Sequence, residues 1–368
     1  MARPSNRRTP APSGDGPARP AVRDFTGGSS GHTIEWDVRP VYDFLFSLSG
    51  EAGASEDLPA DDRKWLADAR AALPDAAQPL FKQIRDTDLG VHLASFVVER
   101  PEIASADELV AAFEAAGPAP LLRSIFSEAL TAHPDAEALL ERTLSGDHAA
   151  LGELEVALPE WKKKERLTLL ADPAATLADV LGLTRAWADA FRPIEDRIRG
   201  ILIRDHDLRA GDRASLAGPD LIERTTGGVR WLPEPGVRRV VLAPSYFSRP
   251  YNFLLAGSDW RFFGYPVADE ALDLLDPLAA PLSVLRLHRA LGDGTRLRIL
   301  KLLAGGDLYL TEIAQLLDLS KPTIKHHLTQ LRVAGLVTVV ESGAVVYYSL
   351  KRDRLDDAAL EIKRFLVG

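Results

Sequence analysis

Apolar residues recur at helical spacing along most of this chain, and the most informative stretch lies near the C-terminus. Ile324, Leu328 and Leu331 fall on one face of a predicted helix. Ser320 can cap this helix, and Pro322 suits its first turn. The opposite face presents hydrogen-bonding and cationic side chains without an acid, namely Lys321, Thr323, Lys325, His326, Gln330 and Arg332. Such groups can bind base edges and phosphates in a DNA major groove.

The segments on either side of this helix complete a known motif. A second short amphipathic helix precedes it, with apolar positions at Leu310, Ile313, Leu316 and Leu317. The runs LVTVV and VVYYSL follow it and flank a four-residue loop, Glu341–Ala344, which indicates a β-hairpin. Helix, turn, helix and hairpin in this order predict a winged helix-turn-helix that binds DNA.

Two further helices are predicted at the ends of this C-terminal region. Asp293 or Thr295 can cap the first, from which we expect Leu297, Leu300 and Leu303 to face inward. The second covers 354–366, with apolar positions at Leu355, Leu360, Ile362 and Phe365. Helices at both ends leave apolar surface uncovered, which a two-fold partner would bury. We therefore expect a homodimer.

The sequence predicts that the rest of the chain is mainly helical, with small β elements. Residues 32–41 resemble a strand, and the following VYDFLFSL suits the start of a buried helix. The β-branched and aromatic runs within 228–267 indicate two or three strands, and 268–280 a helical connector. Nine helices are predicted between them, near 59–72, 76–85, 88–98, 105–116, 119–132, 134–145, 147–157, 160–170 and 174–209.

Composition divides the chain into three parts: a tail at 1–31, a mainly helical region at 32–280 and the winged helix-turn-helix at 281–368. The tail is rich in Pro, Gly, Ser and Arg and has almost no large apolar residue, so it predicts disorder. A basic arm that touches DNA is the alternative for it. Residues 281–368 hold 13 Lys and Arg against 9 Asp and Glu, although the whole chain carries −9. This asymmetry favours DNA contact at the C-terminal end.

Several classes of function are disfavoured by what the sequence lacks. The chain has no cysteine, which excludes disulfides and thiolate metal sites. No apolar run approaches the roughly 20 residues needed to span a bilayer, and no signal peptide is evident, so we expect a cytoplasmic protein. We find no nucleophile elbow, phosphate-binding loop or metalloprotease motif, and therefore predict no enzyme, cofactor or metal. The run Asp205-His206-Asp207 invites a metal hypothesis but lacks a second set of ligands.

The C-terminal 85 residues or so resemble the ArsR family of bacterial winged-helix repressors, through ALGDGTRLRILKLL, LTEIAQLLDLSKPTIKHHLTQLRVAGLV and VVYYSL. The resemblance implies a homodimer. It also implies recognition residues at Ser320, Lys321, Thr323, Lys325, His326 and His327, with Gln330 near the backbone. Two features depart from the metal-sensing members: Leu308 to Leu310 stand where a cysteine pair occurs, and the last helix has no histidine. The loop at 341–344 also lacks the arginine that is frequent there.

Aromatic residues concentrate between Trp231 and Tyr265, beside a few polar groups. Small ligands are held in apolar pockets with a few polar contacts, so this segment suggests an effector site. The candidates are Trp231, Tyr246, Arg249, Tyr251, Trp260 and Phe263. The alternative is that the aromatic side chains form the core between sheet and helices.

These observations together predict a DNA-binding transcriptional regulator, a repressor that binds a palindromic operator as a dimer. The N-terminal region would sense a signal that thiolates do not bind, such as a small molecule. The alternative is an architectural protein that binds DNA with little sequence preference and recruits a protein partner through its N-terminal region. The affinity ratio between operator and random duplex separates the two.

Overall fold

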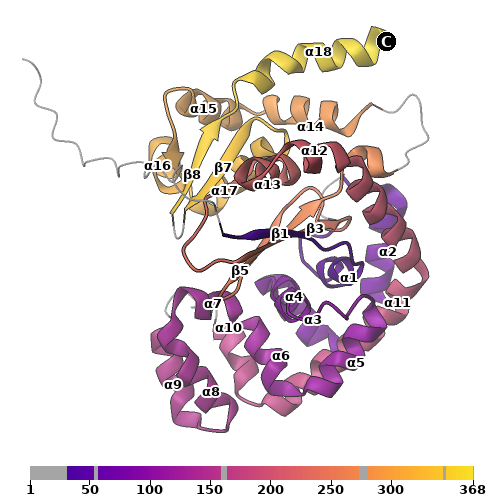
Figure 1. The fold of residues 1–368 in the computed structure, drawn as a ribbon, viewed down its shortest axis with the longest axis vertical. Helices are drawn as coiled ribbons and strands as arrows, with labels where there is room; N and C mark the ends of the chain where they lie inside the picture. The colour runs from indigo at the N-terminus through magenta and orange to yellow at the C-terminus, as the bar shows by residue number, and fades with distance from the viewer. Residues whose placement is uncertain (1–30, 54–56, 159–163, 273–279, 343–344, 368) are drawn as a thin grey trace, which may run out of the picture. The chain divides into compact units, whose positions relative to one another are not determined.

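The computed structural model describes residues 31–53, 57–158, 164–272, 280–342 and 345–367 (Figure 1). The predicted tail at 1–31 lies outside them except for Gly31, so its disorder and its role as a DNA-binding arm both stay predictions. Residues 32–368 form one contiguous unit. The division at residue 280 is likewise a prediction that the structure does not test. No helix among the described residues is both long enough and apolar enough to cross a membrane.

The described residues between 41 and 226 are mainly helical. The sequence predicts helical structure as far as about residue 217, so the helix at 218–226 was not predicted. The first helix is α1 (Val41–Ser47). Most helix boundaries after it lie within a few residues of the predicted ones, because capping residues close in sequence set them. Ser105 forms a capping box at the start of α5, and the Asp147 carboxylate caps α9. One predicted helix is divided, at Phe126. The helices are α2 (Ala60–Ala71), α3 (Gln78–Thr87), α4 (Leu89–Val98), α5 (Ala106–Ala116), α6 (Pro118–Ile125), α7 (Ser127–Ala132), α8 (Glu137–Leu144), α9 (His148–Ala157), α10 (Lys164–Leu167), α11 (Pro173–Leu208), α12 (Ala210–Ser215) and α13 (Gly218–Thr226).

The 36-residue helix α11 lies beside α5 and α6 and organises this layer (Figure 1). Asp172 caps it and Pro173 begins it, so its start is encoded locally. Trp187 and Phe191 are fully buried on its inner face. The Trp187 indole donates a hydrogen bond of 2.8 Å to the Ser47 hydroxyl, which ties α11 to α1.

A four-stranded sheet of order β1-β3-β5-β4 packs against these helices. Strands β1 (Thr33–Trp36), β3 (Arg239–Ser245) and β5 (Trp260–Pro266) are parallel, whereas β4 (Phe253–Ala256) is antiparallel to β5. Val241 and Phe262 face the helical core, and Leu242 and Phe263 face α13, following the period of two along each strand.

The prediction of two or three strands between residues 228 and 267 was wrong, since the structure has four. The missed strand is β4, whose sequence FLLA is too short and uniformly apolar to reveal a period. The predicted connector at 268–280 is a short 3₁₀ helix at Asp269–Leu272, and its next seven residues lie outside the described ranges.

The C-terminal region folds as the predicted winged helix-turn-helix, which confirms the fold class of mostly α structure with small β elements. Among the described residues, its core is formed by buried side chains of the first four helices, including Leu287, Ile299, Ile313 and Leu328, and of the hairpin, including Tyr348. The elements are α14 (Leu282–Leu291), α15 (Gly294–Leu303), β6 (Leu308–Tyr309), α16 (Leu310–Leu317), α17 (Lys321–Val333), β7 (Val337–Ser342), β8 (Val345–Leu350) and α18 (Asp353–Val367).

Two leucines that we expected to face inward are exposed. Leu297 is 48% exposed and Leu316 is 59% exposed. Each lies two positions from a residue that does fill the core, Ile299 and Ala314, and two positions on a helix are about 200° apart. The inward assignments were therefore wrong for these two, whereas Leu300 and Leu303 are buried as predicted.

The sheet of the winged helix includes a strand that the sequence did not assign to it. Strand β2 (Val229–Trp231) pairs in parallel with β7, opposing Val229 to Val339 and Trp231 to Glu341. The resulting order is β2-β7-β8-β6. The N-terminal region therefore supplies one edge of the C-terminal sheet, and the outer edge of β7 is already paired.

Candidate nucleic-acid interface

Local sequence sets the start and the orientation of α17. The Ser320 hydroxyl accepts a hydrogen bond from the Thr323 amide at 3.3 Å, and Pro322 lies in the first turn, as predicted. Asp318 adopts a left-handed conformation that ends α16. Ile324, Leu328 and Leu331 are fully buried and hold α17 against the core, so its opposite face points outward.

The outward face of the first two turns is a contiguous polar surface. Its members are exposed and include no acid: Ser320, Lys321, Thr323, Lys325 and His326. Exposed cations and hydroxyls on one helix face can reach both phosphates and base edges when the helix enters a major groove. We refer to these five residues as the α17 surface.

His327 lies further inside than its neighbour. Its imidazole is half-buried, with Nδ1 3.9 Å from an Asp293 carboxylate oxygen at the start of α15. Burial lowers the pKa of His327, although the Asp293 charge opposes that effect. His327 is therefore neutral near pH 7 and packs between α17 and α15, where it can position His326.

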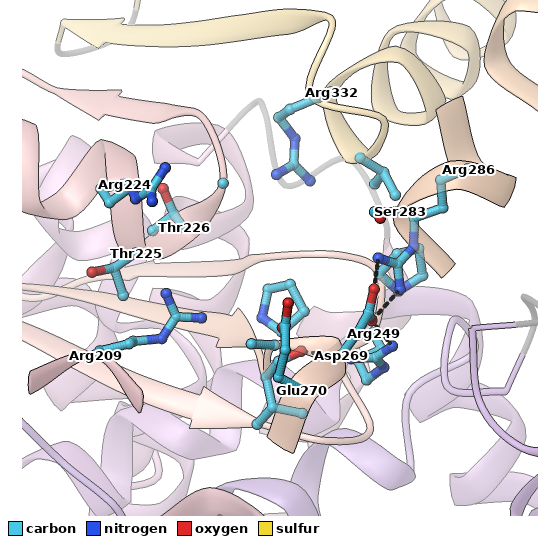
Figure 2. Close-up of a pocket in the computed structure, with 16 residues that line it drawn as sticks. Arg209, Arg224, Thr225, Thr226, Arg249, Asp269, Glu270, Ser283, Arg286 and Arg332 are labelled. Atoms are coloured by element: carbon cyan, nitrogen blue, oxygen red, sulfur yellow. Dashed lines mark hydrogen bonds and ion pairs between the residues drawn. The ribbon is translucent and has the colours of Figure 1, made fainter. Parts of the chain in front are cut away.

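The last turns of α17 point toward the N-terminal region instead. Gln330 and Arg332 are half-buried, and Arg332 lines a cavity that both regions form (Figure 2). Burial raises the pKa of Glu51, and the nearby charges of Lys325 and Arg332 oppose this rise. Arg332 and Lys325, a member of the α17 surface, therefore both lie near Glu51 of the N-terminal region.

The aromatic effector candidates are mostly core residues. Trp231, Tyr246, Trp260 and Phe263 are each at most 2% exposed and lie in the hydrophobic clusters on the two faces of the first sheet. Tyr251 is half-buried in the loop before β4. The packing agrees with the alternative that these side chains form the core, and their role in binding a ligand stays a prediction.

Arg249 is the one effector candidate on the cavity that Arg332 lines. Its guanidinium is fully buried and donates to Asp269 at 2.6 Å and to the Val267 carbonyl at 2.5 Å. The sequence did not reveal the other arginines that line this cavity, because they come from distant segments with no common motif. They are Arg209, Arg224 and Arg286.

Asp205, from the run considered as a metal site, has a structural role. Its buried carboxylate accepts hydrogen bonds from Arg209, from the Tyr265 hydroxyl at 3.0 Å and from the Ala268 amide at 2.7 Å. These contacts join the end of α11 to the sheet. Within the described ranges, no group of three His, Asp or Glu side chains is arranged to hold a metal ion.

Comparison with known proteins bears on the same region. Residues 293–339, from the cap of α15 into β7, match the model of the arsR family of bacterial regulatory proteins. The chain is 41% identical over 72 residues to the transcriptional repressor SdpR of Bacillus subtilis, covering 20% of this chain and 80% of that protein. It is 39% identical over 83 residues to the HTH-type transcriptional regulator CmtR of Mycobacterium tuberculosis, covering 23% and 70%.

A further relative is an uncharacterized HTH-type transcriptional regulator of Methanocaldococcus jannaschii, 40% identical over 72 residues, with 19% of this chain and 81% of that protein covered. All these matches fall on the C-terminal part, whose relatives are transcriptional regulators. The winged helix-turn-helix, its cationic α17 surface and these relatives agree. The chain belongs to the arsR family of bacterial regulatory proteins and is a DNA-binding transcriptional regulator that carries a long N-terminal extension.

Proposed function

We propose that this protein is a homodimeric repressor whose two α17 helices read the half-sites of a palindromic operator. The observation that carries the proposal is the α17 surface, which is exposed, cationic and free of acids along its outward face. Repression is supported by the name of SdpR, which is a transcriptional repressor. The residues that we propose to contact DNA are Ser320, Lys321, Thr323, Lys325 and His326, with His327 and Gln330 in support and Arg332 at the backbone.

The apolar surface of α18 supports the dimer. Leu360 is 50% exposed, Leu366 71% and Val367 75%, and this helix packs along α14. Large aliphatic side chains exposed together on one helix favour burial against a second copy. Placing α18 at the two-fold axis would leave both α17 surfaces available to DNA.

The contacts between the two regions support a sensing role for residues 32–280. Arg286 of α14 forms ion pairs with Asp57 and with Asp269, the latter at 3.0 Å. Strand β2 pairs with β7, and Lys351 lies 3.4 Å from Glu223 of α13. A signal that moved the N-terminal region would therefore act on the DNA-binding helices, and a coupling of about 1–3 kcal/mol would suffice for regulation.

Footprinting on the DNA upstream of the protein's own gene tests this proposal. Two protected stretches of backbone are expected on one face of the duplex, with centres about 34–36 Å apart or at a multiple of that spacing. Hydroxyl-radical cleavage with increasing amounts of the full chain measures this pattern. A single protected patch would contradict binding of the operator by a dimer.

The second candidate function is an architectural protein with little sequence preference. The observation in its favour is that β2 and the N-terminal region cover part of the winged helix, which suits recruitment of a partner beside DNA. In that case footprinting gives uniform protection along the duplex, with no periodic patches.

A further inference from the structure

The loop that follows α1 is held in place by contacts with two other helices. The Arg70 guanidinium of α2 donates hydrogen bonds to the Ser49 carbonyl at 3.1 Å and to the Ala52 carbonyl at 2.9 Å. A Cβ added at Gly50 would lie only 2.9 Å from a backbone carbonyl oxygen of α3, so a glycine is needed for this close approach. These contacts fix the backbone on both sides of Glu51, whose side chain is exposed.

One face of α17 runs from the DNA-facing end of the helix into the contact with the N-terminal region. Arg332 follows Lys325 by seven positions, or about two helical turns, so the two residues lie on the same face. Arg332 points into the cavity that both regions form (Figure 2). A Cβ added at Gly228 would lie 3.9 Å from Arg332 Cγ, and the Gly228 carbonyl accepts a hydrogen bond of 2.9 Å from the Val339 amide. The N-terminal backbone therefore packs beside this face.

Glu51 is the acid that lies near this cationic face. Burial and the Asp88 charge raise the pKa of Glu51, whereas the charges of Lys325 and Arg332 lower it. Burial also raises the pKa of Tyr251, and there the Glu51 charge adds to the rise while the Arg332 charge opposes it. Both groups thus place the Glu51 carboxylate close to α17.

We propose that Glu51 is an autoinhibitory acid, which the N-terminal region holds beside Lys325 in the place of a DNA phosphate. A duplex that approaches α17 competes with the Glu51 carboxylate for Lys325, and its phosphates are repelled by that carboxylate. The inference rests on the proposed function of α17 and adds a residue that opposes it. Because the acid belongs to the N-terminal region, a signal that moves this region away from α17 would raise the affinity for DNA.

Substitution of Glu51 tests the proposal in the full chain. Glu51→Gln should bind duplex DNA about two- to fivefold more tightly than the wild type, which is the effect expected of an exposed ion pair. The gain should be smaller in a Lys325→Ala background, because Lys325 carries most of the competition, and smaller at high salt, because exposed charges are screened. Fluorescence anisotropy with the upstream duplex and with a scrambled duplex measures both changes.

The matched control removes an exposed acid elsewhere in the N-terminal region. Glu153 lies on α9, which Figure 1 shows away from α17, and it pairs with Arg142 at 3.2 Å. Glu153→Gln changes the net charge by the same amount and should bind DNA as the wild type does. Circular dichroism shows whether each variant is folded.

A cross-linking experiment tests the contact without DNA. The chain has no cysteine, so Glu51→Cys combined with Lys325→Cys introduces the only two thiols. A short bismaleimide should bridge them within one chain, as mass spectrometry detects, whereas Glu153→Cys combined with Lys325→Cys should give no such bridge. Bound duplex should slow the bridging, and the bridged protein should bind DNA more weakly than the same variant before bridging.

The outcomes separate this proposal from the proposed function. Similar gains on the upstream and scrambled duplexes support it, because phosphates are common to both. Equal affinity of Glu51→Gln and the wild type, an undiminished gain in Lys325→Ala, or absence of the bridge overturns it. Absence of DNA binding by both the wild type and Glu51→Gln overturns it as well. If the bridge and the gain are found but upstream DNA is not preferred, sequence-specific regulation fails and the autoinhibitory contact stands.

Discussion

Lys325→Ala and His326→Ala are each expected to weaken operator binding by about 5- to 150-fold, which corresponds to the roughly 1–3 kcal/mol of a lost base or phosphate contact. Both side chains are exposed on the second turn of α17, so neither holds the core. The winged helix is positioned by Ile324, Leu328 and Leu331, which the substitutions leave in place. Fluorescence anisotropy with an operator duplex at fixed salt measures the change.

The controls remove the same side chains elsewhere on the chain. Lys82→Ala in α3 and His148→Ala in α9 alter exposed residues of the N-terminal region and should leave affinity unchanged. Thermal melting of all four variants should match that of the wild type, because surface substitutions change stability by about 0.5 kcal/mol or less. Wild-type affinity in both α17 variants would show that another surface binds DNA.

A second large effect is expected at Asp43, a fully buried carboxylate on α1. Its Oδ1 accepts hydrogen bonds of 2.7 Å from the Ser245 hydroxyl and the Phe247 amide, whereas Oδ2 has no partner among the described residues. Burial raises the pKa of Asp43 to about 7, and the hydrogen bonds oppose this rise. The folded protein thus holds this proton more tightly than the unfolded chain.

The contribution of Asp43 to stability is therefore full at acidic pH and declines as pH rises toward 7. Between pH 5 and pH 8 the wild type should lose about 3 kcal/mol through this group, given roughly 1.4 kcal/mol per pKa unit. Asp43→Asn does not titrate and keeps an oxygen for Ser245 and Phe247. The free energy of unfolding of the variant, relative to the wild type, should rise by that amount over this range.

Urea denaturation at several pH values measures this difference. Each variant is compared with the wild type at the same pH, which cancels the contribution of every other carboxylate to the pH dependence of stability. Asp269 is one with the opposite effect, because the neighbouring arginines lower its pKa against the effect of burial. Asp196→Asn changes a carboxylate that is 93% exposed and should leave the pH profile unaltered. A profile in Asp43→Asn parallel to that of the wild type would mean that Asp43 does not titrate in this range.

The winged helix-turn-helix could be predicted because local sequence encodes its parts. Ser320 and Asp293 cap their helices within one turn, and the hairpin strands are adjacent in the chain. The same locality explains why most helix boundaries of the N-terminal region were predicted within a few residues. The inward face was misassigned at Leu297 and Leu316, because a leucine-rich helix offers more than one apolar stripe.

The features that link the two regions could not be predicted. Strand β2 pairs with β7, which lies more than a hundred residues further along the chain. The three residues of β2, Val229 to Trp231, are too few to reveal that partner. The arginine cavity brings together side chains from five segments, each of which reads locally as an ordinary surface charge. Conversely, the aromatic residues that suggested a ligand site are mostly core residues. A buried core and a ligand pocket are both rich in aromatic side chains, so local composition does not distinguish them.

The central claim is that this chain binds a particular DNA sequence through α17. The most direct measurement is the ratio of its affinities for its own upstream DNA and for a scrambled duplex of equal length and composition, by gel shift at fixed physiological salt. A preference of about a hundredfold or more is predicted, because base-edge contacts add to the sequence-independent attraction of phosphates. Equal affinity for the two duplexes would contradict the claim and favour an architectural protein.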